Sequence, residues 1–212
     1  APNVDASELP ALGARRVIAV DKAYDPHMHC PVAVSESDIA RYGADVGFVG
    51  TYEDARARSL AYLAAHGIAV RVWGNGWEAW KDRPPGLIIE GRAVVNTERE
   101  RAYTKSLCAT RINLGFLRKL NRDTQTDRTM EIPACGAFML AERSDDHLRL
   151  FEDGQEAAFF GADDELLEKV RYYLAHEDER AAIARAGRQR CLDAGYSETE
   201  RMRLMIDQCR AG

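Results

Sequence analysis

The chain has 212 residues and a mass of 23.7 kDa, of which 46% are hydrophobic and 30% charged. This length supports one large or two small folded units with a buried core but not two Rossmann-sized halves, and the composition excludes a disordered chain. Lys and Arg number 29 against 34 Asp and Glu, a net charge of −5. This charge argues against a general nucleic-acid or anionic-membrane surface, while local basic clusters remain compatible with it.

Five cysteines are widely spaced and form no C-x-x-C motif. This pattern argues against a disulfide framework or a zinc ribbon and indicates a reducing compartment, so we expect a cytoplasmic protein. No apolar run approaches the ~20 residues of a membrane helix, and we expect no transmembrane segment. The amino terminus has neither a signal-peptide pattern nor an initiator Met, so we expect a processed form or an excised piece.

Residues 1–43 contain one short apolar run, Arg16–Val20. Two X-Pro pairs follow, ending in Pro26 and Pro31, and such pairs favour extended or turning backbone. We therefore predict a strand and a connecting arm. His27 and His29 lie in this arm and raise the question of a metal site, but no third ligand at suitable spacing is evident, so packing of the arm is the favoured interpretation.

From Ala44 onward, short apolar runs alternate with helical runs. A short apolar run at 46–49 is followed by a helical run at 53–66 that Gly67 closes, and by a second apolar run at 68–73. Strand, helix and strand in this order predict a βαβ unit of a buried parallel sheet.

The alternation continues after the break at Pro84-Pro85. An apolar run occupies 92–95, and Thr97 with Glu100 predicts a capping box and a helix to about residue 108. A strand at 111–117, a helix at 128–135 stopped by Gly136, and a strand at 137–140 are predicted next. The remainder is predicted to be helical, with two apolar stripes in the core: Leu166, Leu167, Val170 and Leu174, and Met202, Met205, Ile206 and Cys209.

This order predicts an α/β fold, a Rossmann-like doubly wound parallel sheet with closing C-terminal helices. Such sheets bind ligands beyond the carboxyl ends of their strands. Candidate site loops are therefore those that follow predicted strands: Gly50-Thr51, Gly74–Trp77, Asn96, Arg118–Arg128 and Ala141-Glu142.

The segment Gly74–Ala79 matches the dinucleotide motif G-x-G-x-x-G/A. That motif requires a helix that starts at the glycines and points its N–H groups at a pyrophosphate. The prolines at 84 and 85 leave room for two turns at most, and Trp77 is bulky where the backbone should approach a ligand. We therefore interpret the glycines as a turn and disfavour a dehydrogenase.

The densest charge cluster is Arg118–Arg128, with four cations in eleven residues. At the end of a predicted strand, this cluster would form a local anion-binding site, because guanidinium groups make bidentate hydrogen bonds to phosphate oxygens. A solvated charged loop is the alternative on composition alone. Glu131 follows on the predicted short helix and has the acceptor geometry for a ribose diol, or for a simple helical pair with Arg128.

Several of these runs together resemble the C-terminal half of spore-maturation-type (CgeB-like) glycosyltransferases. The resemblance covers about residues 44–209, and the stretch 111–156 is its most specific part. It rests on five segments: Val46–Tyr52, Val70–Gly74, Ile112–Lys119 with Asn121–Asp123, Arg128–Glu142 and Leu150–Glu156.

This resemblance implies a GT-B fold, in which the C-terminal domain binds a nucleoside-diphosphate sugar and catalysis is usually metal-independent. It implies that Glu131 holds the ribose and that Asp123 stands where the family's Glu-x7-Glu motif has its first Glu. Arg118 and Lys119 are implied diphosphate ligands, and Arg56 and Arg58 lie only loosely where a basic residue often follows the glycine turn. The expected substrate-binding residues are Gly50, Thr51, Gly74, Asn96, Arg118, Lys119, Asp123, Arg128 and Glu131; no catalytic residue, metal ligand or cofactor is assigned.

The resemblance also predicts the domain organisation. Residues 1–43 correspond to the end of an N-terminal domain and an inter-domain arm, and residues 44–212 to the donor-binding domain. The expected activity is transfer of a sugar to an unknown acceptor, with the chain inactive or very weak without its N-terminal domain. A non-catalytic nucleotide-sugar binding module and a GT-B-type sugar-nucleotide epimerase remain the alternatives.

Overall fold

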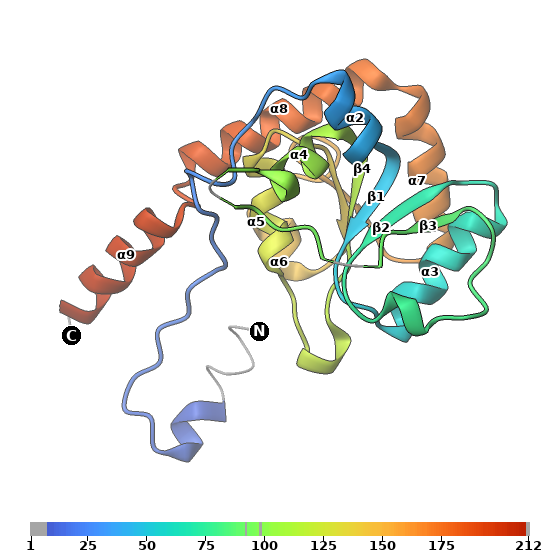
Figure 1. The fold of residues 1–212 in the computed structure, drawn as a ribbon. Helices are drawn as coiled ribbons and strands as arrows, with labels where there is room; N and C mark the ends of the chain where they lie inside the picture. Colours follow the sequence, from blue (N-terminus) through green and yellow to red (C-terminus); the bar gives the residue numbers. More distant parts are fainter. Residues whose placement is uncertain (1–7, 92, 98, 211–212) are drawn as a thin grey trace.

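The computed structural model describes residues 8–91, 93–97 and 99–210. Six parallel strands form one sheet in the order β3-β2-β1-β4-β5-β6 (Figure 1). The predicted doubly wound α/β class is confirmed. The strands are β1 (Ala44–Val49), β2 (Val70–Trp73), β3 (Leu87–Ile89), β4 (Thr110–Gly115), β5 (Met139–Glu142) and β6 (Ala158–Phe160).

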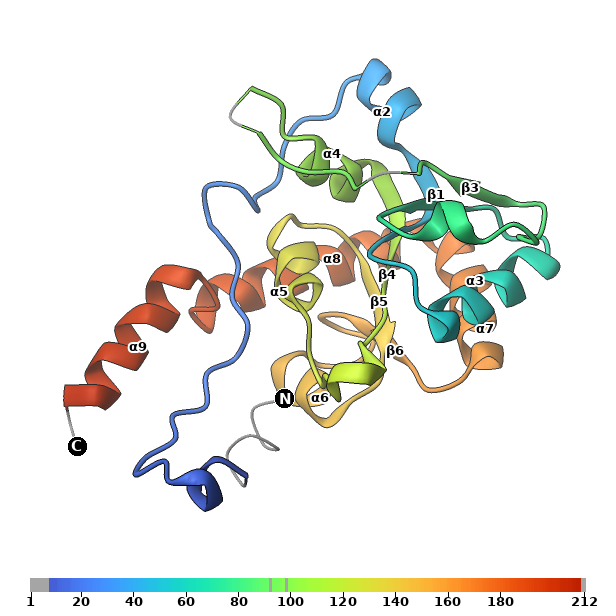
Figure 2. The same cartoon turned by 60° about the horizontal axis from the view of Figure 1, so that its bottom comes forward.

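Helices cover both faces of the sheet, with α3 and α7 on one face and α4 and α5 on the other (Figures 1 and 2). None of the helices within the described ranges has the length and apolar character needed to cross a bilayer. The α-helices are α2 (Glu36–Tyr42), α3 (Asp54–Ala65), α4 (Ala102–Ala109), α5 (Asp127–Ala134), α6 (Asp145–Leu150), α7 (Asp163–Ala175), α8 (Glu177–Asp193) and α9 (Glu198–Arg210), and the 3-10 turns are η1 (Leu9–Leu12), η2 (Trp77–Ala79) and η3 (Lys119–Asn121).

The core has two apolar clusters, one on each face of the sheet. Successive strand residues alternate between them: Leu140 packs in the cluster that α3 and α7 cover, and Met139 in the cluster that includes residues of α4 and α5. This alternation follows from the two-residue period of a strand. Because both faces are covered, most strand residues are apolar, and the charged ones, such as Asp45 and Arg111, lie near the strand ends.

The predicted βαβ unit is present as β1, α3 and β2. Val46 pairs with Val70 on one side and with Ile112 of β4 on the other. Gly67, at φ +81°, ends the helical segment in the left-handed region, where a side chain would be strained. The predicted stop of α5 at Gly136, with φ +68°, is also confirmed.

The prediction of a strand at Arg16–Val20 is wrong. These residues run as irregular backbone and pair with no strand in the described part of the chain. The sequence analysis also missed α2, whose first turn is closed by Ser35: its hydroxyl accepts a hydrogen bond from the backbone N–H of Asp38 at 3.2 Å. A short apolar run thus did not suffice for a strand, because no neighbouring strand was available to it.

The segment between β2 and α4 also differs from its prediction. The third strand is Leu87–Ile89 rather than the apolar run at 92–95, of which Arg92 lies outside the described residues and the rest forms no regular element. Thr97 and Glu100 close a turn on themselves, with the Glu100 N–H donating to the Thr97 hydroxyl at 2.9 Å. They do not cap a helix, and α4 begins only at Ala102.

The prediction of an all-helical remainder is wrong because β6, of three residues, completes the sheet. The first apolar stripe is core: Leu166, Leu167 and Val170 are buried in α7. The second is not, since α9 buries none of its residues and Met202 is 54% exposed. Figure 1 shows α9 projecting away from the sheet, which is why most of its stripe stays exposed.

We predict that Gly187→Ala destabilises the protein, although Ala favours a helix over Gly by about 1 kcal/mol. A Cβ at position 187 would lie 2.2 Å from the carbonyl oxygen of Glu156, so α8 would have to move off the chain beneath it. Overpacking of this kind costs about 1–3 kcal/mol. Urea unfolding measures it, with Ala182→Gly on the exposed side of α8 as the control, for which only the helix propensity is lost. A Gly187→Ala protein as stable as the parent would contradict the close approach.

Candidate functional site

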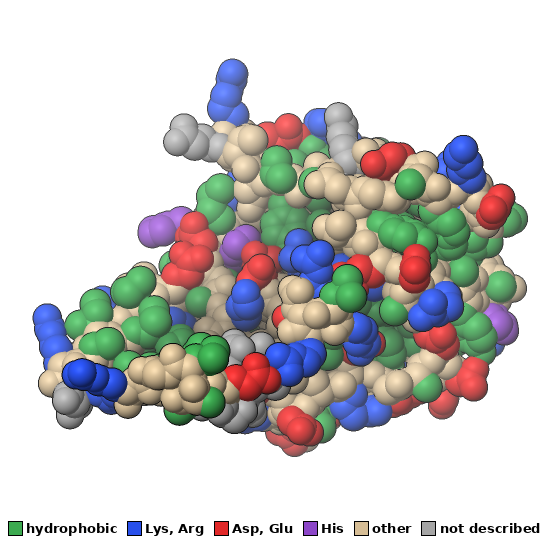
Figure 3. All heavy atoms as spheres, turned by 90° about the horizontal axis from the view of Figure 1, so that it is seen from below, with side chains coloured by type: hydrophobic (Ala, Val, Ile, Leu, Met, Phe, Trp, Pro, Cys, Tyr) green, Lys and Arg blue, Asp and Glu red, His purple; other side chains and the backbone are tan. Residues whose placement is uncertain are grey.

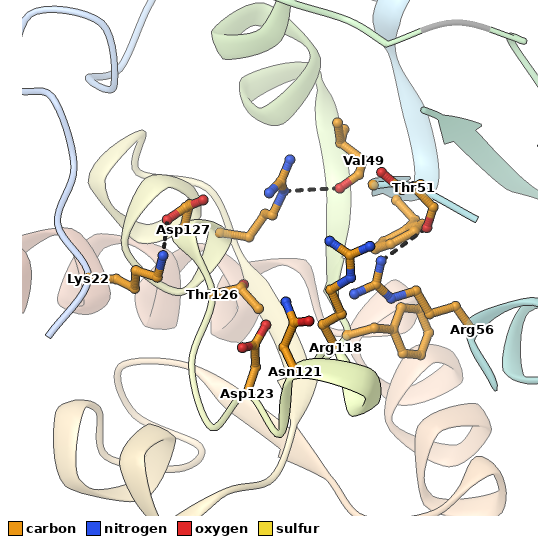
Figure 4. Close-up of a pocket in the computed structure, with 13 residues that line it drawn as sticks. Lys22, Val49, Thr51, Arg56, Arg118, Asn121, Asp123, Thr126 and Asp127 are labelled. Carbon is orange, nitrogen blue, oxygen red and sulfur yellow. Dashed lines mark hydrogen bonds and ion pairs between the residues drawn. The ribbon is translucent and has the colours of Figure 1, made fainter. Parts of the chain in front are cut away.

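A pocket of about 250 Å³ opens where β1 and β4 end side by side (Figure 4). After β1 the chain goes to β2 on one side, and after β4 it goes to β5 on the other, so the loops diverge and leave a crevice. This reversal is the ligand position of a doubly wound sheet. The lining residues are Lys22, Phe48, Val49, Gly50, Thr51, Arg56, Phe116, Arg118, Asn121, Asp123, Thr126, Asp127 and Arg128.

The pocket is cationic in a chain that is acidic overall. Four of its lining residues carry a positive charge and two a negative charge: Lys22, Arg56, Arg118 and Arg128, against Asp123 and Asp127. Figure 3, which looks from below, shows Lys and Arg side chains gathered around a hollow in the middle of this face. A cationic pocket favours an anionic ligand.

Arg118 and Arg128 are each held at one edge of the guanidinium group. The Nε–H of Arg128 donates to the carbonyl of Val49 at 3.1 Å, and Nε of Arg118 lies 3.0 Å from a carboxylate oxygen of Glu53. Within the described residues, the Nη groups of both side chains donate no hydrogen bond. Two oriented pairs of Nη donors are therefore available to a ligand with several oxygen atoms.

Arg56 has a different role, because it is buried beneath the pocket. Only 8% of its surface is exposed, and burial lowers the pKa of its guanidinium. Its Nη1 donates to the carbonyl of Thr51 at 3.0 Å, and Nη2 lies 3.6 Å from Glu53. Arg56 thus holds the turn after β1, and its charge acts on the pocket from below.

The turn after β1 packs tightly against the turn after β2. The Gly50 N–H donates to the carbonyl of Trp73 at 2.8 Å, and the Trp77 indole N–H donates to the carbonyl of Gly50 at 2.7 Å. A Cβ on Gly74 would lie 1.9 Å from the Gly50 carbonyl oxygen, so only glycine fits there. The glycine pattern at 74–76 therefore makes a turn and the short 3-10 turn η2, and no longer helix starts at these glycines.

The start of α5 borders the pocket and is held from behind. The Thr126 N–H donates to the Thr129 hydroxyl at 2.9 Å, and that hydroxyl also bonds Nε2 of His147 at 2.8 Å. Nδ1 of His147 donates to the carbonyl of Glu142 at 2.6 Å, which in a neutral imidazole leaves Nε2 to accept from the Thr129 hydroxyl. Burial accordingly lowers the pKa of His147.

Five of the expected binding residues come together in this pocket: Gly50, Thr51, Arg118, Asp123 and Arg128. Gly74, Asn96 and Lys119 do not line it. The Asn96 side-chain oxygen instead accepts a hydrogen bond from the backbone N–H of Thr104 at 3.0 Å, near the start of α4. Lys119 forms an ion pair with Glu142 at 2.8 Å. Spacing along the sequence could not separate Lys119 from Arg118, because their directions depend on the turn η3.

Glu131 also lies outside the lining, and both of its carboxylate oxygens have partners. The Tyr103 hydroxyl donates to one at 2.5 Å, and Nε2 of His29 lies 3.6 Å from the other. Burial, together with the Glu131 carboxylate, raises the pKa of the Tyr103 hydroxyl well above its usual value, so it remains a donor. A ribose diol would have to displace His29 to bind both oxygens of Glu131.

The arm of residues 25–29 is stabilised by its own polar groups. Asp25 accepts the N–H of His27 at 2.8 Å, and the Asp25 N–H donates to Nδ1 of His29 at 3.2 Å. In the part of the chain that the structure describes, no three His, Cys, Asp or Glu residues converge as a metal site would require.

Sequence reasoning did not assign Lys22, Asn121, Thr126 or Asp127 to the site, and it placed Arg56 only loosely. Asn121, Thr126 and Asp127 lie within the charged cluster that the sequence had singled out, so the cluster was the available signal. Lys22 carried no such signal, because it is nearly a hundred residues away from that cluster and reaches the pocket through the arm.

Fold and site together define a Rossmann-like domain with a cationic pocket at the switch point of its sheet. Residues 55–207 match the model of a family described as glycosyl transferase-like, and the chain belongs to that family. No curated protein sequence matches the chain.

Solved structures share the fold at low sequence identity. The C-terminal domain of LpcC, a group 1 glycosyl transferase from Francisella tularensis, has a TM-score of 0.58 at 11% identity, covering 83% of this chain and 100% of that domain. Anabaena HepE in complex with UDP-glucose has a TM-score of 0.69 at 12% identity, and the match covers 99% of this chain and 62% of HepE. Sucrose-phosphate synthase from Thermosynechococcus elongatus has a TM-score of 0.68 at 13% identity, and the match covers 93% of this chain and 54% of the synthase. The chain thus has the fold of a GT-B C-terminal domain and spans little more than half of the two longer proteins.

We predict that acid destabilises the protein partly through His147. Because burial lowers its folded-state pKa, the unfolded chain binds a proton first, and stability falls as the pH drops from about 6.5 towards that lowered value. His147→Gln should lose about 1–3 kcal/mol at pH 7.5 and show a shallower decline between pH 7 and 5. Urea unfolding at several pH values measures both. Parallel pH profiles for parent and variant would contradict the assignment.

Proposed function

We propose that this chain is the donor-binding domain of a glycosyltransferase that uses a nucleoside-diphosphate sugar. The observation that carries the proposal is the pair of anchored arginines, Arg118 and Arg128, at the switch point of the sheet. Their Nη groups match the oxygens of a diphosphate, and the N-terminus of α5 lies beside them, where the helix dipole favours an anion.

The same groups suit the chemistry of sugar transfer. When the bond between sugar and diphosphate breaks, negative charge develops on the leaving nucleoside diphosphate. Arg118 and Arg128 stabilise that charge directly, and buried Arg56 adds its field without having to move. Because these cations are in place before the ligand arrives, little reorganisation accompanies the reaction.

The sugar and the nucleoside would lie on either side of this diphosphate. Asp123 lines the pocket and is the proposed contact for the donor sugar, as the first acidic residue of the Glu-x7-Glu pattern. Glu131 is the proposed ribose contact, once His29 has moved away from it. Within the family, we propose a place in the CgeB-like branch, which the motif from Arg128 to Glu142 supports.

We also propose that residues 1–43 connect this domain to an N-terminal domain that binds the acceptor. The exposed apolar residues of α9, such as Met202 and Ile206, suit a helix that packs on a further part of the protein. With the acceptor side and any catalytic base in that other domain, this chain alone would bind the donor and transfer sugar weakly or not at all. A reducing, cytoplasmic location fits its five free cysteines.

We predict that Arg128→Ala weakens the binding of UDP about tenfold to a hundredfold, because a charge-assisted pair of hydrogen bonds is lost. Isothermal titration calorimetry measures the affinity, with GDP as a second nucleotide and Lys119→Ala as the matched control. Lys119 has the same charge but is paired with Glu142 outside the pocket, so its variant should bind as the parent does. Equal loss in both variants would show a general charge effect, and no binding of any nucleoside diphosphate would overturn the proposal.

Glu131→Gln tests the ribose contact separately. The amide keeps one acceptor for Tyr103 but loses the charge that two ribose hydroxyls prefer, so UDP should bind about tenfold more weakly. Inorganic pyrophosphate, which has no ribose, should bind to the variant and the parent alike. Unchanged UDP binding by a folded Glu131→Gln protein would remove Glu131 from the site.

A further inference from the structure

The arm that precedes the sheet is fixed to the domain immediately beside the pocket. Asp21 lies at the centre of this attachment: Arg149 donates to its carboxylate at 3.1 Å, Gln125 does so at 2.9 Å, and Arg201 lies 3.5 Å away. Burial alone would raise the pKa of Asp21, but the hydrogen bonds from Arg149 and Gln125 lower it overall, so the carboxylate stays charged. Helices α6 and α9 and the loop before α5 thus hold one residue of the arm.

The backbone of the arm is also held at Lys22 and at Tyr24. The Lys22 N–H donates to the side-chain oxygen of Gln125 at 2.9 Å, and the Tyr24 N–H donates to the carbonyl of Tyr196 at 3.3 Å. The Glu198 N–H in turn donates to the carbonyl of Tyr24 at 3.0 Å. These contacts fix the backbone from which the Lys22 side chain extends.

The Lys22 side chain extends into the pocket (Figure 4). Lys22 is one of the lining residues, and its Nζ lies 3.1 Å from the carboxylate of Asp127 in the first turn of α5 (Figure 4). The close-up shows Lys22 on the side of the pocket opposite Arg56 and Arg118, so the cations face one another across the cavity. Both partners of the ion pair are about half exposed, at 52% and 53% of their side chains.

We infer that Lys22 is a donor-binding residue, whose ammonium group contacts the diphosphate from the side of the arm. The inference rests on the proposed function and extends it, because it makes the arm part of the donor site. Asp127 is an internal partner that the ligand displaces or shares. A half-exposed ion pair is weak in water, whereas a diphosphate between Lys22 and Arg128 offers several charged oxygens at once.

Two substitutions test the two members of the pair in opposite directions. Lys22→Met keeps the unbranched side chain up to the ammonium group and should weaken the binding of UDP and of inorganic pyrophosphate about tenfold, as the loss of a charged contact does. Asp127→Asn removes the competing carboxylate and should tighten both about twofold to fivefold. In the double variant, most of the gain from Asp127→Asn should disappear, because that gain acts through Lys22.

The measurement is calorimetric titration of the full 212-residue chain, with thermal unfolding recorded for each variant. Lys119→Met is the control for charge and exposure, and its affinity should equal that of the parent. Folded Lys22→Met protein that binds UDP as tightly as the parent, or Asp127→Asn protein that binds more weakly, would overturn the inference.

Arg128→Ala in the same titration distinguishes failure of the Lys22 inference from failure of the proposed donor-binding function. If Arg128→Ala loses affinity while Lys22→Met does not, Lys22 is not a ligand and the donor site stands without the arm. If Arg128→Ala binds as the parent does, or the parent binds neither UDP nor pyrophosphate, both proposals fail together.

Discussion

The structure depends on one topological constraint, the side-by-side placement of β1 and β4 in a parallel sheet. Parallel strands need crossover connections, and those after β1 and β4 run to opposite edges of the sheet. The chain therefore cannot fill the space above their carboxyl ends with its own backbone. The pocket that remains is lined by what the diverging loops carry, and here they carry arginines.

Cationic side chains can be concentrated there because each is fixed by a neutral or acidic group of the protein. Arg128 is held by a backbone carbonyl, Arg118 by Glu53, and Arg56 by both kinds of partner. These contacts use one edge of a guanidinium group and offset part of the repulsion between like charges. These arginines are in place before a ligand arrives, as their proposed role in stabilising a diphosphate leaving group requires.

Much of the fold could be predicted from the sequence where the pattern was strong. The βαβ unit from β1 to β2 and helix α5 with its Gly136 stop were found, because buried strands and glycine stops are local signals. The strand β6, of three residues, was missed because so short a run does not differ from helical surroundings. The apolar stripe of α9 was placed in the core wrongly, since a helical period shows that a face is apolar but not what covers it.

The sequence by itself determined the class of fold, the cationic cluster at 118–128 and the glycine turn after β1. These are local properties, set by hydrophobic period, residue charge and backbone freedom. Only the tertiary structure decided which of the charged side chains share a pocket. It directed Lys119 to Glu142 and paired Glu131 with Tyr103 and His29, while the arm brought Lys22 across from a distant part of the chain. Where a side chain points and what it contacts depend on turns, crossovers and ion pairs between segments far apart in the sequence. The spacing of residues along the chain does not predict these contacts.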